Sequence, residues 1–132
     1  MRTAPLGLLA SLPLLLLNGC FTDAATRLAY DIEAATSRVG LADGARFTLV
    51  HRAPSKSGEC AGPYKIQLDA VGLIVIWCKN ADGDMTVSSH STSYHRRFVE
   101  TPETHILDKP AGESLIIDLE RRDGRVIIAS VK

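Results

Sequence analysis

Three cysteines are the residues of this 132-residue chain best suited to covalent chemistry, namely Cys20, Cys60 and Cys78. A thiol can be acylated, can form a disulfide or can bind a metal ion, and the surrounding residues decide among these. Cys20 differs from the other two because it ends a leucine-rich run that starts near the N-terminus. We therefore expect Cys20 to have a chemistry of its own.

The N-terminal segment has the composition of an export signal. Arg2 supplies one early positive charge, and an apolar stretch from 6 to 17 follows it. A membrane-spanning helix needs about 20 apolar residues. This stretch is shorter and is interrupted by Gly7 and Pro13. An ordinary cleaved signal would show small residues at both positions of an Ala-x-Ala-like site, and these are missing.

The order Leu17-Asn18-Gly19-Cys20 resembles the lipobox of bacterial lipoprotein precursors, with Leu three residues before the cysteine and a small Gly directly before it. Asn18 is the less usual residue of the four. The resemblance implies that residues 1–19 are a cleaved signal peptide and that Cys20 becomes the first mature residue, with lipid on its sulfur and an acyl group on its amine. Several acyl chains make such an anchor effectively permanent. Phe21 stands where an Asp would resemble an inner-membrane retention signal, which favours the outer membrane.

The mature chain, residues 20–132, has the size of one compact domain, which we expect in the periplasm. Loss of Arg2 leaves 14 basic residues against 15 acidic ones, a formal charge of minus one. A near-neutral domain is poorly suited to binding a polyphosphate over a broad face, so no nucleic acid partner is expected. The sequence also indicates no cofactor.

A structural disulfide is the chemistry that we expect for Cys60 and Cys78, because an exported chain passes through an oxidising compartment. The alternative is a redox or metal-binding pair. Their spacing is not Cys-x-x-Cys, and no nearby histidine completes a metal site. A bridge would stabilise the fold by about 3 kcal/mol on the chain-entropy estimate.

The remaining polar groups show no catalytic or metal-binding pattern. The four histidines lack a recognisable ligand spacing, so we predict no metal site. No nucleophile elbow, zinc motif or phosphate-binding loop is present, so we predict no catalytic residue and no enzyme activity.

One cluster is a candidate for binding a partner, and it consists of Tyr94, His95, Arg96, Arg97 and Phe98. Arginine binds carboxylates and phosphates with two hydrogen bonds, so the cluster is suited to an acidic group of a protein or polymer. The alternative is a solvated edge strand that its charges protect against aggregation.

Apolar spacing predicts a helix that begins after Thr22 or Asp23 and stops at Gly40. Its apolar face is formed by Leu28, Ile32, Ala35 and Val39. Alternating or β-branched segments then predict strands near 46–49, 64–69, 73–78, 85–87, 94–99, 115–120 and 125–131.

The second and third of these strands are expected to form a hairpin about Val71, and Asp123-Gly124 is expected to close a terminal hairpin. In the first hairpin one face is shared by Tyr64, Ile66, Leu68, Ile74, Ile76 and Cys78. The continuous apolar run 73–78 predicts a strand covered on both faces. We expect the helix to cover the face that carries Leu73, Val75 and Trp77.

The predicted fold class is therefore α+β: an N-terminal helix packed on a mostly antiparallel sheet of six or seven strands. The alternative is a small β-barrel or sandwich with an N-terminal helix.

The expected function is that of a non-enzymatic binding or assembly module at the periplasmic face of the outer membrane. Its partners would be the lipid bilayer, through acylated Cys20, and an envelope protein or polymer. The alternative is an inhibitor or immunity-type lipoprotein that blocks an envelope enzyme. Membrane-bound lysozyme inhibitors are similar in being small, lipid-anchored β domains with a disulfide, although the N-terminal helix departs from their architecture. An enzyme is the least favoured class.

Overall fold

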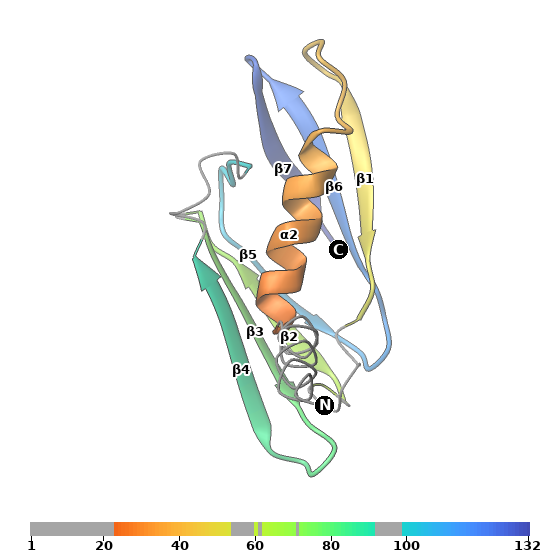
Figure 1. The fold of residues 1–132 in the computed structure, drawn as a ribbon, viewed down its shortest axis with the longest axis vertical. Helices are drawn as coiled ribbons and strands as arrows, with labels where there is room; N and C mark the ends of the chain where they lie inside the picture. Colours follow the sequence, from red (N-terminus) through yellow and green to blue (C-terminus); the bar gives the residue numbers. More distant parts are fainter. Residues whose placement is uncertain (1–22, 54–59, 61, 71, 92–98) are drawn as a thin grey trace, which may run out of the picture.

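A computed structural model describes residues 23–53, 60, 62–70, 72–91 and 99–132. These residues form one helix and seven strands, and the strands divide into two antiparallel sheets (Figure 1). The predicted α+β class is confirmed. The described strands lie in two sheets rather than one, and they do not close into a barrel. The lipobox with Cys20, and the cluster from Tyr94 to Phe98, lie outside the described residues.

The elements follow one another as α2 (Ala24–Thr36), β1 (Arg46–His51), β2 (Tyr64–Leu68), β3 (Leu73–Lys79), β4 (Met85–Ser91), β5 (His105–Lys109), β6 (Leu115–Arg122) and β7 (Arg125–Val131). One sheet has the order β1-β6-β7 and the other has the order β4-β3-β2-β5.

Helix α2 begins where the sequence predicts. The Asp23 carboxylate accepts a hydrogen bond of 2.8 Å from the backbone N–H of Thr26, which satisfies a donor of the first turn. The helix ends at Thr36, earlier than predicted. The hydroxyls of Thr36 and Ser37 each donate to a backbone carbonyl three residues earlier, and such local bonds compete with continued helix. Val39 is buried as predicted although it lies beyond the helix.

The three-stranded sheet contains the predicted terminal hairpin. Asp123 and Gly124 join β6 to β7 with φ values of +53° and +77°, which are both left-handed. A two-residue turn of this kind twists in the same sense as the strands that it joins. The register shifts between Asp118 and Leu119, where Ala129 is an extra residue in β7, and such a bulge bends the strand that carries it.

The predicted register of the other hairpin is also confirmed. Tyr64 pairs with Cys78, Ile66 with Ile76, and Leu68 with Ile74. The same six side chains are buried.

Two strands of the four-stranded sheet differ from the prediction. Strand β4 continues through the polar run up to Ser91, because its inward polar groups meet the start of α2: the Ser88 hydroxyl accepts from the N–H of Ala25 at 3.2 Å. Strand β5 was not predicted, since its five residues lack alternation and Pro102 and Pro110 lie close on either side.

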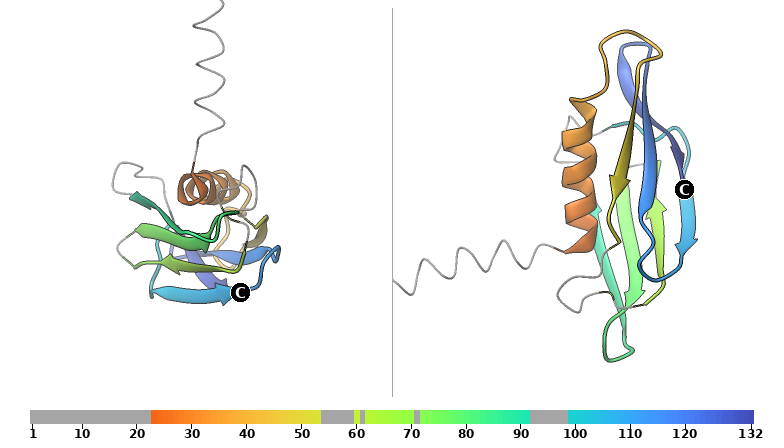
Figure 2. Two further views of the ribbon diagram at one scale, coloured as in Figure 1. Left: turned by 90° about the horizontal axis from the view of Figure 1, so that it is seen from below. Right: turned by 90° about the vertical axis from the view of Figure 1, so that its right-hand side faces the viewer.

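The predicted position of the helix was wrong. Helix α2 contacts β1 of one sheet and β3 and β4 of the other (Figures 1 and 2). It shares one core cluster with Ile74 and Ile76 of β3. Both isoleucines are 1% exposed. The opposite face of β3, with Leu73, Val75 and Trp77, is only half-buried, so β3 is covered on one face and not on both. No helix among the described residues has the length and hydropathy needed to cross a bilayer.

Candidate functional site

The outer face of the four-stranded sheet carries a concave surface that offers both apolar and polar groups. Strand alternation sends every second side chain away from the core. In one row across the sheet the neighbours are Val87, Trp77, Lys65 and Asp108. In the next row they are Ser89, Val75, Gln67 and Ile106.

Five of these residues line an open groove of about 940 Å³, which we call the outer groove, namely Lys65, Gln67, Trp77, Ile106 and Asp108. Its main lining residues are Lys65, Gln67, Trp77, Met85, Ile106 and Asp108. Ligand sites are usually concave surfaces that combine apolar walls with a few polar groups, and the outer groove has this composition.

The apolar part of this face is unusually exposed. Met85, Val87 and Ile106 are 60%, 58% and 58% exposed, and they lie on the two edge strands on either side of Trp77. They account for three of the six large hydrophobic residues exposed in the described part of the chain. Apolar side chains grouped in this way, in contrast to single exposed ones, are typical of interaction surfaces.

A polar cluster of two buried residues and the exposed Glu113 supports one end of the outer groove. The Tyr64 hydroxyl donates a hydrogen bond to the backbone carbonyl of Glu113, and the Lys109 ammonium lies 3.2 Å from the Glu113 carboxylate. Burial, together with the charge of Glu113, raises the pKa of Tyr64 to about 12. The tyrosine therefore stays protonated at neutral pH and holds β2 to the segment that follows β5.

The predicted disulfide is confirmed, and it lies at the same end of the groove. Cys60 and Cys78 are bonded, with their Cα atoms 5.4 Å apart. Cys78 directly follows Trp77 on β3. The bond therefore ties the chain that enters β2 to the strand that carries the groove tryptophan. Closing a loop of 18 residues contributes about 3 kcal/mol on the chain-entropy estimate.

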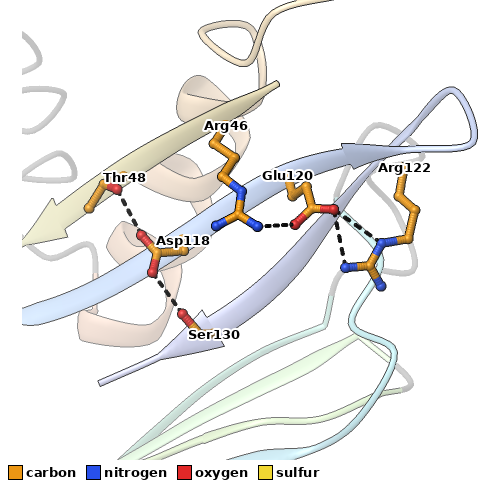
Figure 3. A network of polar contacts seen from close by, with 6 residues as sticks. All are labelled: Arg46, Thr48, Asp118, Glu120, Arg122 and Ser130. Carbon is orange, nitrogen blue, oxygen red and sulfur yellow. Dashed lines mark hydrogen bonds and ion pairs between the residues drawn. The ribbon is translucent and has the colours of Figure 1, made fainter. Parts of the chain in front are cut away.

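The outer face of the three-stranded sheet is different, because its polar groups bind one another (Figure 3). Asp118 accepts hydrogen bonds of 2.7 Å from both Thr48 and Ser130, and these bonds lower the pKa of its carboxyl group. Glu120 beside it forms ion pairs with two arginines, one from β1 and one from β6. This face satisfies its own polar groups, so the outer groove is the better candidate for a ligand.

A second titratable pair joins α2 to β1. His51 is buried, and its Nδ1 lies 2.7 Å from the carboxylate of Asp31. Burial lowers the pKa of His51 below its ordinary 6.5, and this effect outweighs the opposing effect of Asp31. The histidine is therefore neutral at pH 7, where its Nδ1–H can donate to Asp31.

Stability is expected to fall as the pH falls below about 6.5. Because the pKa of His51 is lower in the folded state, the unfolded chain takes up the proton first, and the contribution of His51 is lost as the pH falls through the folded pKa. Urea unfolding at pH 7.5, 6.5 and 5.5 measures this loss. His51→Asn keeps a donor for Asp31 but does not titrate, so its stability should change less over this range. An equal change in both proteins would assign the pH dependence to another group.

The structure brings together two of the predicted site residues, Cys60 and Cys78. Within the described ranges, no group of three or more His, Cys, Asp or Glu side chains is arranged to hold a metal ion. Sequence reasoning missed the outer groove, although the strict alternation of Lys65 and Gln67 with buried residues was a signal for its polar part.

No family model, curated protein or solved structure matches the chain. Any assignment of function therefore depends on the chemistry of the chain itself.

Proposed function

We propose that the chain is a lipid-anchored protein of the bacterial cell envelope, a non-enzymatic binding module at the periplasmic face of the outer membrane. Its outer groove receives an envelope protein or polymer. The observation that carries this proposal is the outer groove itself, in which Trp77 lies between exposed apolar side chains.

The groove residues suit adhesion to a large ligand. Tryptophan is the side chain most enriched at positions that dominate binding energy, because it buries a large area and keeps one N–H donor. Lys65 lies directly across from both Trp77 and Asp108, so a cation adjoins the indole and an anion lies on the far side of that cation. These charges are placed to orient a ligand that the apolar residues hold.

The proposed anchor supports the same geometry. Asp23 lies three positions after Cys20, and an extended chain spans at most about 11 Å over that distance. A lipid on Cys20 would therefore hold the start of α2 close to the bilayer. Helix α2 packs on the inner face of the four-stranded sheet, whereas the outer groove lies on the opposite face. The groove would then remain accessible from the periplasm.

Trp77→Ala is expected to weaken ligand binding at least tenfold, because loss of a central aromatic contact costs about 2 kcal/mol or more. Binding is measured by quantitative capture of envelope proteins on the purified protein and by co-sedimentation with isolated cell-wall polymer. Tyr30→Ala is the matched control, since Tyr30 is a half-exposed aromatic residue of α2 and not of the groove.

Equal binding by wild type and Trp77→Ala would contradict the role of the outer groove. If the captured partner is an envelope enzyme and its turnover stops in a stoichiometric complex, the protein is an inhibitor. A partner without such activity identifies an assembly or binding role.

A further inference from the structure

The four sheet edges of the described domain differ in how they are protected. An unpaired edge strand exposes backbone donors and acceptors, and proteins usually protect it with charges, proline or a covering segment. Strand β5 is only five residues long, contains Asp108 and Lys109 and is followed by Pro110. Strand β1 begins with Arg46. Both edges therefore carry the usual protection.

The edge of β7 is covered by another part of the chain. The N–H of Glu100 donates to the carbonyl of Val126 at 3.1 Å, and the N–H of Ile128 donates to the carbonyl of Glu100 at 2.9 Å. Backbone groups that are already bonded in this way do not recruit another strand.

Within the part of the chain that the structure describes, strand β4 has none of these protections. Its seven residues, Met85–Ser91, include no proline and no Lys, Arg, Asp or Glu, and β4 is the last strand on its side of the sheet (Figure 1). Among the four edges of the described sheets, β4 is the one for which the described residues supply neither charge nor cover.

The hairpin geometry shows which groups of β4 point outward. The N–H of Asn80 donates to the carbonyl of Asp84, so these two residues form a hydrogen-bonded pair. Such pairs alternate along an antiparallel ladder. Met85, Val87 and Ser89 then belong to the intervening pairs, and their backbone N–H and C=O groups point away from β3. The side chains of the same three residues are exposed on the outer face.

We propose that β4 pairs antiparallel with β4 of a second copy of this chain, which joins the two four-stranded sheets into one continuous sheet across a twofold axis. Only an extended backbone can satisfy a row of alternating donors and acceptors, so the occupant is a β-strand. A second copy suits this edge because β4 has no charged residue that would face its own symmetry mate.

The position of α2 favours a second copy over a strand from another protein. A twofold axis that relates two antiparallel edge strands is perpendicular to the sheet, so both α2 helices lie on the same face of the joined sheet. Each helix starts against β4 itself, through the 3.2 Å bond from Ala25 N–H to Ser88 and the 3.4 Å contact between Thr26 and His90. If Cys20 is lipidated, as the proposed function states, both anchors leave on one side and can enter one leaflet.

The joined sheet also connects the two outer grooves. Met85 and Val87 are exposed beside the seam on the groove face, so each copy extends the apolar surface of the other. A seam of seven residues is a small interface, and we expect it to be weak in dilute solution. Anchoring in one membrane raises the effective concentration of the second copy, which favours the pair there.

Cysteine cross-linking of the full chain in its own membranes tests this pairing. Val87→Cys, Ser89→Cys and a co-expressed mixture of the two are treated with a mild oxidant and separated without reductant. At least one of the three samples should give a dimer, because residues on facing strands have Cβ atoms about 5 Å apart. Ile106→Cys is the control, since it is equally exposed but lies on the opposite edge strand.

A second variant blocks pairing at the β4 edge and leaves the strand in place. Ser89→Pro deletes one outward N–H that β3 does not use, and proline is tolerated where an edge N–H faces solvent. Combined with the cross-linking cysteine, Ser89→Pro should lower the dimer yield at least tenfold relative to Ser89→Ala, at an unchanged melting temperature. Where Ser89→Cys gives the dimer, the proline is placed at Val87 instead and compared with Val87→Ala.

Several results would overturn the pairing: no dimer from any β4 sample, equal cross-linking of Ile106→Cys, or a dimer that survives the proline. Trp77→Ala should leave the dimer yield unchanged, so a failure of ligand binding in the outer groove is distinguished from a failure of pairing.

A lower dimer yield in Cys20→Ala than in the anchored chain supports the contribution of the membrane, and an equal yield would overturn that contribution.

Discussion

Cys20→Ala is expected to move the protein from the membrane fraction to the soluble periplasmic fraction, with complete loss of lipid labelling. The variant has no sulfur to receive lipid, and each buried methylene of an acyl chain contributes about 0.8 kcal/mol to anchoring. The anchor is therefore worth far more than a contact of the domain surface with the membrane. Fractionation and incorporation of a labelled fatty acid measure the two parts of this expectation.

Cys60→Ser is the control for the anchor, because it removes a different cysteine and leaves the lipobox intact. It should remain labelled and in the membrane fraction. Continued retention and labelling of Cys20→Ala would contradict the lipoprotein assignment and, with it, the proposed position of α2 near the bilayer.

Ile76→Ala should lower the free energy of unfolding by about 3 to 4 kcal/mol, which is large against the total of about 5 to 15 kcal/mol of a small domain. Ile76 is 1% exposed, pairs with Ile66 on β2 and lies in the same core cluster as the apolar residues of α2. Truncation removes buried methyl groups and leaves a cavity that the surrounding strands can fill only in part. Urea unfolding at pH 7.5 measures the loss.

Val75→Ala is the matched control, because Val75 precedes Ile76 on β3 but points to the outer face. Because Val75 is half-buried, Val75→Ala should lower the free energy of unfolding by about 1 kcal/mol or less. A comparable loss in both variants would contradict one-sided burial of β3. A larger loss of free energy of unfolding in Val75→Ala than in Ile76→Ala would indicate that α2 covers the face predicted from the sequence.

Alternation predicted the local pairing of this protein well. Ile66 and its neighbours alternate with polar residues, and this period of two led to the register that places Ile66 opposite Ile76. Asp123 and Gly124 predicted a tight turn because both adopt a left-handed backbone at low cost. Cys60 and Cys78 formed a natural pair once Cys20 was assigned to the lipid.

Continuous apolar runs and polar runs were less informative. Strand β3 is apolar on both faces, so its sequence does not distinguish the side of Ile76 from the side of Trp77. The strand predicted at 85–87 stopped at Val87 because the run that follows is polar, yet the Ser88 hydroxyl of β4 is bonded to the start of α2. Such a contact joins residues 63 positions apart, and no local pattern predicts it.

By itself, the sequence determined the elements whose cause is local: the capped start of α2, the two hairpins with their register, the disulfide pair, and the expectation of a lipid anchor at Cys20. The tertiary structure alone decided the division into two sheets, the side of β3 that α2 covers, and therefore which side chains remained outside to form the groove around Trp77. The physical reason is that hydrogen bonds and turns act over a few residues. Burial depends on which distant surfaces meet, and for an apolar strand either face can be buried.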